Sequence, residues 1–307
     1  MKYFLSMILG LSWSATAHGA LTQQQLNQAK TLCDNSLVQC AAQIDSFIAQ
    51  ASPHSAFWYE LKLLKFNALF ILHQDQQLLD ETNAMVLIPE LPAYFKANLY
   101  VYHAKELLFT GNKLQGQHYL DKASELLEHL SAASRKPLMD VRLVNIQMSL
   151  DENRPQGYER LKALEIRYQK SGDWAMKYEL YNNLGHITYW LGKHSESVHY
   201  RQLCLEAAMH THNVQFQAEG NYNLARQRTK FQDFATDINV HYLNAIKLYG
   251  QIDDQLMVAQ SQLFLSELLW QQGKANEAKQ MFAAMNRQLI PDYNQQHLQR
   301  IQQLMSQ

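Results

Sequence analysis

A period of about forty residues constrains this chain more than any other feature. Glycines that suit the end of a helix recur every 81 residues, or two periods, at Gly111, Gly192 and Gly273. Residue types that favour a helix start recur independently every 40 residues, at Asp173, Asn213 and Asp253. A unit this short cannot bury a core alone, so we expect consecutive units to stack on one another.

The apolar residues between these signals follow helical spacing. Leu184 and Ile187 precede Gly192, and Val198 and Leu205 follow it, as expected for one face of two successive helices. Each period therefore predicts a helix pair, broken near its middle by a residue in the left-handed conformation.

Composition agrees with a helical, folded chain. The 307 residues are 47% hydrophobic and carry a net charge of -1, which excludes a disordered chain. With 27 basic against 28 acidic residues, the protein has no excess of positive charge that would attract the phosphates of a nucleic acid. The chain has few Gly and Pro residues (11 and 6) and many Gln residues (34). This composition favours helices over a loop-rich β fold.

Small residues recur where two helices of a pair would touch. In this register, thirteen of twenty such positions over five units hold Ala, Gly, Ser or Cys, whereas about four are expected from 61 such residues in 307. The first-helix position of the series is Ala104, Val144, Gly185, Ala225 and Ser266. Close helix packing is the physical reason for such a series.

The best-defined unit, from Tyr181 to Leu205, resembles a tetratricopeptide repeat (TPR): an aromatic, Leu-Gly, a second aromatic, a turn Gly and small residues on the second helix. The resemblance covers about residues 95–290 well and residues 54–94 weakly, with units about six residues longer than usual. It implies an all-α, right-handed α-solenoid of TPR-like hairpins. The long units are similar to the extracytoplasmic TPR sensory segments of bacterial signalling proteins.

The first residues have the pattern of a secretory signal. Lys2 is followed by an uncharged, mostly apolar run over residues 3–13, and small residues allow a cut after Ala17 or after Gly19. We therefore expect a signal peptide over residues 1–17 and a periplasmic mature protein; the alternative is an amphipathic first helix. No later stretch has eighteen apolar residues, so no second membrane segment is expected.

The remaining chain divides into three expected parts. Residues 21–53 predict a helix pair that caps the array, residues 54–290 an array of about six hairpins, and residues 291–307 a polar capping helix.

Two cysteines near the N-terminus are candidates for a disulfide. Cys33 and Cys40 are too far apart to bond on one continuous helix, but Asn35 and Ser36 between them are typical of a helix end and a new N-cap. A bridge could then link two helices at their turn, and two free thiols are the alternative. Cys204 stands alone.

No sequence motif for catalysis, phosphate binding or metal binding is present. His210 and His212 lack a partner at a recognised metal spacing, and we interpret them as solvated residues at a helix end. We therefore predict no catalytic residues, no metal and no cofactor.

The inner face of a solenoid is lined by the first helix of each pair, and there we predict a site for a protein or peptide partner. The positions that the resemblance assigns to it are Arg142, Asn145, Asn182, His186, Tyr189, Tyr222, Arg226, Glu267 and Trp270. Aromatic residues at such positions also knit helices together, so a purely structural role is an alternative. Two other functions remain open: a small-ligand sensor with a cavity around Tyr189, Tyr222 and Trp270, and a cell-envelope enzyme.

Overall fold

The computed structural model describes residues 22–131, 133–150, 154–232 and 238–306, and in this part of the chain all regular structure is helical. The predicted all-α solenoid is confirmed. Within the described residues, an N-terminal pair of helices is followed by six hairpins and a last helix. The bounds of the first seven helices are α1 Gln23–Asn35, α2 Leu37–Ile48, α3 Ala56–Ile71, α4 Asp75–Val86, α5 Ala93–Phe109, α6 Lys113–His129 and α7 Pro137–Leu150. The others are α8 Arg154–Tyr168, α9 Trp174–Trp190, α10 His194–Met209, α11 Val214–Phe231, α12 Ile238–Gln251, α13 Gln255–Gln271, α14 Ala275–Ala284 and α15 Gln295–Met305.

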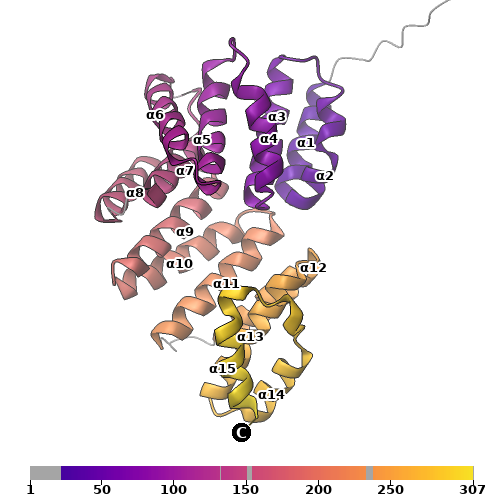
Figure 1. Cartoon of the computed structure of the whole chain (residues 1–307), viewed down its shortest axis with the longest axis vertical. Coiled ribbons are helices and arrows are strands. Elements are labelled where there is room, and N and C mark those ends of the chain that lie inside the picture. Colours follow the sequence, from indigo (N-terminus) through magenta and orange to yellow (C-terminus); the bar gives the residue numbers. More distant parts are fainter. Residues whose placement is uncertain (1–21, 132, 151–153, 233–237, 307) are drawn as a thin grey trace, which may run out of the picture.

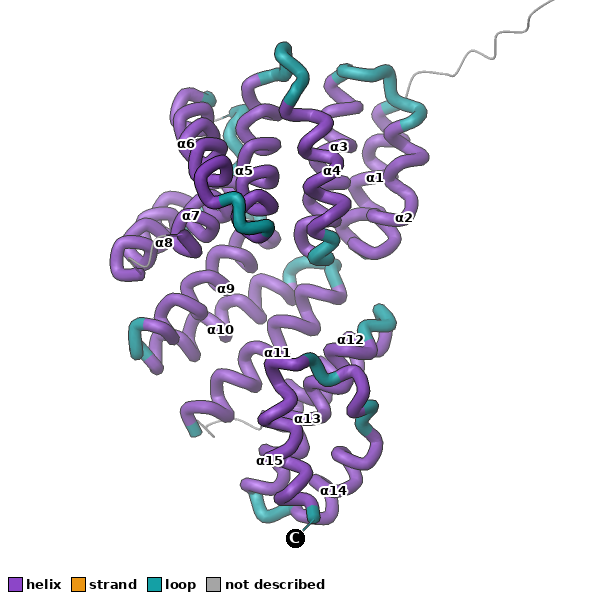
Figure 2. The backbone as a smooth tube through the Cα atoms, in the orientation of Figure 1, coloured by secondary structure: helices purple, strands orange, loops and turns teal. Residues whose placement is uncertain are grey.

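The hairpins follow one another in chain order along the molecule. Figures 1 and 2 show α1 and α2 near one end of the long axis and the C-terminus at the other, with the helix direction turning along the array. Each first helix packs on the second helix of its own hairpin and on its neighbours along the chain. The expected signal peptide over residues 1–17 lies outside the described residues. No helix among the described residues is long and apolar enough to cross a membrane.

In the hairpins whose turn is described, a left-handed residue lies between the two helices, as the glycine period predicts. Gly111, Gly192 and Gly273 have φ of 85°, 71° and 76°. Gln232 occupies the same place in its hairpin with φ of 52°, so the conformation persists even where a side chain makes it less favourable.

Helix starts follow the predicted N-caps with one correction. The side chains of Asp173 and Asn213 accept hydrogen bonds from the first turns of α9 and α11. Asp253, however, has φ of 57° and does not cap α13; Asp254 caps it instead, through the Met257 N–H. The prediction was wrong by one residue because two aspartates are adjacent and the turn needs the first of them in the left-handed conformation.

The small-residue series lies where the helices touch. Ala104, Ser197, Cys204 and Ala225 are fully buried. A Cβ on Gly185 would come within 3.0 Å of the Arg201 side chain, so small residues let the two helices of a hairpin approach closely.

A disulfide joins the first two helices. Cys33 and Cys40 are bonded, with their Cα atoms 4.6 Å apart. Ser36 ends α1 and caps α2 through a hydrogen bond from the Gln39 N–H, as the sequence predicted. This break in the helix brings the two thiols together, and both sulfurs lie in the core.

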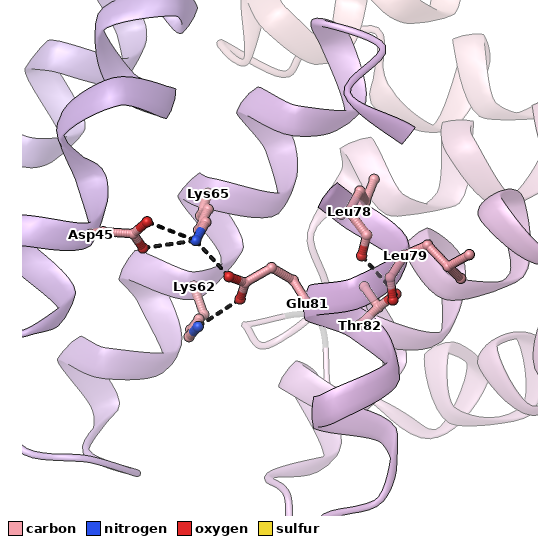
Figure 3. A network of polar contacts seen from close by, with 7 residues as sticks. All are labelled: Asp45, Lys62, Lys65, Leu78, Leu79, Glu81 and Thr82. Atoms are coloured by element: carbon pink, nitrogen blue, oxygen red, sulfur yellow. Dashed lines mark hydrogen bonds and ion pairs between the residues drawn. The ribbon is translucent and has the colours of Figure 1, made fainter. Parts of the chain in front are cut away.

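An ionic network links α2, α3 and α4 (Figure 3). Lys65 on α3 is 3% exposed, and its ammonium contacts Asp45 at 2.8 Å and Glu81 at 2.6 Å. Lys62 donates to the second oxygen of Glu81 at 2.7 Å. Because a buried ammonium is stable only with matched partners, this network fixes how the three helices pack.

The apolar core also joins segments that are distant in sequence. Ala68 near the end of α3 belongs to the same buried cluster as Tyr178 on α9 and Phe216 on α11. The turn after α3 therefore lies beside the starts of α9 and α11, as Figure 1 shows. Ile71 at the end of α3 lines the same cavities as Glu179 on α9 and Phe216 on α11.

Candidate ligand-binding groove

Three connected cavities lie between the end of α3 and the first helices of the later hairpins. Their volumes are about 230, 350 and 820 Å³. The first and second share Ile71, Glu179 and Phe216, and the second and third share Ile71, His73 and Glu219. We call these three cavities the groove. Since α7, α9, α11 and α13 supply most of its later wall, it lies on the inner face of the solenoid.

Three asparagine side chains follow one another along the groove. Asn145 on α7 and Asn183 on α9 line the 350 Å³ cavity, and Asn223 on α11 lines the 820 Å³ cavity. All three are partly exposed, and none has a side-chain hydrogen bond within the described chain. We call them the amide ladder. Each offers a donor and an acceptor at the groove surface.

A buried arginine holds the wall of the groove together. Arg142 on α7 is 1% exposed and donates to Glu179 on α9, to the Tyr102 hydroxyl on α5 at 2.7 Å and to Asn67 on α3 at 2.8 Å. Burial alone would lower the pKa of Arg142, but Glu179 and Tyr102 raise it, so the guanidinium stays charged. Four helices thereby meet at one side chain.

A carboxylate without a basic partner lies at the centre of the groove. Glu219 accepts hydrogen bonds from the Tyr178 hydroxyl and from Gln215, and no lysine, arginine or histidine of the described chain is within ion-pair distance. Burial raises the pKa of Glu219, and Asp254 adds to this, whereas the two hydrogen bonds and His73 oppose it. The net shift is upward, as expected for a carboxylate whose charge is not balanced.

The residues predicted for the site fall into three groups. Asn145, Asn182 and Tyr222 line the groove. His186, Tyr189, Arg226 and Trp270 are exposed or partly exposed, but they do not line its three cavities.

The third group, Arg142 and Glu267, is buried, which corrects their predicted place on an open surface. The partners of Arg142 enclose it. Glu267 is 8% exposed because α15 folds onto α13, where Arg300 and His297 contact its carboxylate. Position along a repeat indicated the direction of these side chains but not what would cover them.

Two predicted residues have further contacts that fix their orientation. Arg201 crosses Gly185 and donates to the Asn182 side chain, which orients that amide. Arg226 lies over Phe264 with its guanidinium 4.9 Å from the ring centre.

Several groove residues were not among those predicted. Glu179 and Glu219 lie one helical turn before Asn182 and Tyr222 on the same helices, so extending the predicted stripe by three residues would have found them. His73 and Lys105 could not be found this way. They belong to earlier hairpins, and only the superhelical turn of the array brings them beside α7, α9 and α11. Among the described residues, no group of three His, Cys, Asp or Glu could hold a metal ion.

No family model matches the sequence, and no curated protein matches it. Solved structures do. A Rap protein complexed with Competence and Sporulation Factor matches with a TM-score of 0.57 at 13% identity, over 84% of this chain and 73% of its own. The apo form of RapI matches with a TM-score of 0.56 at 10% identity, over 73% of this chain and 64% of its own.

A third match is a signal-transduction ATPase with numerous domains, with a tetratricopeptide-repeat sensor, from Pyrococcus horikoshii. Its TM-score is 0.60 at 12% identity, over 85% of this chain but only 39% of the ATPase chain. At these identities the similarity shows the fold alone. The chain is a TPR-like α-solenoid.

Proposed function

We propose that this chain is a non-enzymatic scaffold that binds an extended peptide, or a peptide segment of a protein, in its groove. The amide ladder is the observation that carries the proposal. Asn145, Asn183 and Asn223 present unpaired donors and acceptors from three successive first helices. An extended backbone also offers a donor and an acceptor at each residue, so it is the ligand that such a series suits.

The fold similarity is consistent with a binding role. The Rap structure is that of a protein complexed with a factor, and the Pyrococcus horikoshii structure includes a repeat sensor. The groove also has an apolar component, with Phe70, Ile71 and Phe216 beside the polar residues. Such a mixed lining suits side chains of a peptide as well as its backbone.

Selection of peptides on the purified full chain tests this proposal. A displayed library of random twelve-residue peptides should yield binders. The triple variant Asn145→Ala/Asn183→Ala/Asn223→Ala should weaken them on the order of 100-fold in fluorescence anisotropy, since each lost hydrogen bond contributes about 1 kcal/mol. The matched control replaces three exposed asparagines elsewhere, Asn27, Asn83 and Asn276, with alanine. Equal affinity of the two triple variants, or no binders at all, would contradict the proposal.

We further propose that the chain acts outside the cytoplasm, in the periplasm, after removal of residues 1–17 or 1–19. The signal pattern supports this, and the Cys33–Cys40 disulfide is typical of an oxidising compartment. The resemblance to extracytoplasmic sensory segments supports a role in envelope signalling.

A small-ligand sensor is the second candidate, and the 820 Å³ cavity favours it. Tyr222 lines this cavity together with Tyr249 and Tyr293. Tyr189 and Trp270, which the sequence also suggested for such a cavity, do not line it. Binding of small molecules without any peptide preference would favour this candidate.

A further inference from the structure

The 820 Å³ cavity of the groove is acidic. Glu219 on α11 and the adjacent Asp253 and Asp254 before α13 line it, and His73 is the only basic side chain among the described lining residues. None of the three carboxylates has an ion-pair partner within the described chain. Three carboxylates gathered without a cation repel one another, and a positive group would relieve this.

A buried hydroxyl supplies a second, independent sign of a missing ligand. Tyr249 lines the same cavity, is 1% exposed, and its hydroxyl has no hydrogen-bond partner within the described chain. Glu219 and Asp254 are both close enough to raise the pKa of Tyr249, which burial raises most. A buried polar atom without a partner is rare, because leaving it unmatched costs about 1–3 kcal/mol.

The exposed part of the cavity lining includes apolar side chains. Val38, Leu256 and Tyr293 line the cavity and are among the most exposed large hydrophobic side chains of the described chain. Tyr222 and Tyr249 lie deeper, with their ring centres 6.5 Å apart. Aromatic faces beside carboxylates suit a cation that carries apolar neighbours.

We infer that this cavity binds an ammonium or guanidinium group of the peptide ligand, held by Glu219 and Asp254 and flanked by tyrosine rings. The inference rests on the proposed function and adds to it the chemical class of the peptide. A positive group can donate charge-assisted hydrogen bonds to both carboxylates and to the free Tyr249 oxygen. The exposed Val38, Leu256 and Tyr293 contact the residues on either side of the basic one.

Binding of defined peptides distinguishes three sources of the positive group: a basic side chain, a free peptide N-terminus and a free polyamine. The series has one frame, Ala-Leu-X-Leu-Ala, acetylated and amidated at its ends, with X as Lys, Arg, norleucine or Glu. A fifth peptide has norleucine and a free N-terminus, and spermidine represents a free polyamine. Isothermal titration on the full chain gives each affinity. We expect the Lys or Arg peptide, or the free-amine peptide, to bind at least about 10-fold more tightly than the capped norleucine peptide.

Two variants connect this preference to the cavity. Glu219→Gln keeps the size of the side chain and an acceptor for Tyr178, and Asp254→Asn keeps the helix cap; each should remove most of the preference. Glu277→Gln, at an exposed position on α14, should retain it. Circular dichroism verifies that the variants are folded.

The outcomes separate this inference from the proposed function. Equal binding of the norleucine, Lys and Glu peptides would overturn the inference while leaving groove binding intact. Tight binding of spermidine with no peptide preference would overturn both the peptide source and the proposed function. Loss of the preference in Glu277→Gln as well would place the cation elsewhere and overturn the inference.

Discussion

At the scale of single residues, Arg142 has the largest structural consequence. Its guanidinium contacts Asn67, Tyr102 and Glu179, which come from three other helices. The five donors of a planar guanidinium are spread over three nitrogens and reach all three partners, whereas the three donors of a lysine share one nitrogen. Arg142 was predicted to contact a ligand, but it is buried and holds the helices of the groove wall together.

The variant Arg142→Met should destabilise the protein by about 3–5 kcal/mol. It leaves the Glu179 carboxylate partly buried and unpaired. A buried charge that has lost its partner lowers the free energy of unfolding strongly. Arg160→Met, at an exposed position on α8, is the control and should change the free energy of unfolding by less than about 0.5 kcal/mol. Urea unfolding measures both, and similar midpoints for the two variants would show that the network contributes little.

The sequence predicted the type of residue on the inner face better than its exposure. Asn145, Asn182 and Tyr222 were found among the residues that line the groove. Arg142 and Glu267 were not, because a long polar side chain on the correct face can still be covered by another element. Periodicity predicts the direction of a Cα–Cβ bond, but it does not predict which other element covers the side chain.

At the scale of helices, local signals predicted the boundaries well. The left-handed glycines and the caps at Ser36, Asp173 and Asn213 lie where the sequence indicated. These signals succeed because they act within four residues of the chain. The contacts between α2, α3 and α4 had no such local signal, since Lys65, Asp45 and Glu81 are distant in sequence.

Stability should depend on pH through Glu81. Burial alone would raise the pKa of Glu81, but hydrogen bonds from Lys62 and Lys65 outweigh it and lower the pKa. A lowered pKa in the folded state adds stability above the carboxyl's ordinary value, near 4.5, which is lost as the pH falls through the folded value. Glu81→Gln should therefore be less stable than the parent at pH 7, with the gap closing in acid.

Thermal unfolding between pH 7 and pH 3 measures that gap. Glu125→Gln, at an exposed position on α6, reports the effect of losing a surface carboxylate alone. A gap between parent and Glu81→Gln that stays constant with pH would show that the ionic network of Figure 3 does not couple to folding.

At the scale of the whole molecule, the superhelix brings distant helices together around the groove. Stacking of hairpins follows from the repeat, but the turn that brings Ala68 and Phe216 into one cluster does not. Small differences in packing at each interface add up along the array, so its pitch is not readable from any single unit. The fold is nevertheless robust, since 10–13% identity suffices to retain it.

The compartment can be tested on the intact molecule. Protein recovered from the native cell should begin at His18 or Ala20, according to the cut that is used. After denaturation without reductant, alkylation should modify Cys204 alone, because Cys33 and Cys40 are bonded. Mass spectrometry reads both results. An intact Met1, or three alkylated cysteines, would refute export into an oxidising compartment.

The Arg142 network also has a consequence for the order in which the chain is made. Asn67 leaves the ribosome 75 residues before Arg142, and Glu179 follows 37 residues later. Until α9 has been made, a growing chain holds the arginine without the carboxylate of Glu179, so the contact that joins α7 to α3 and α5 is incomplete. The Arg142 network can therefore be completed only after the chain has been made past Glu179.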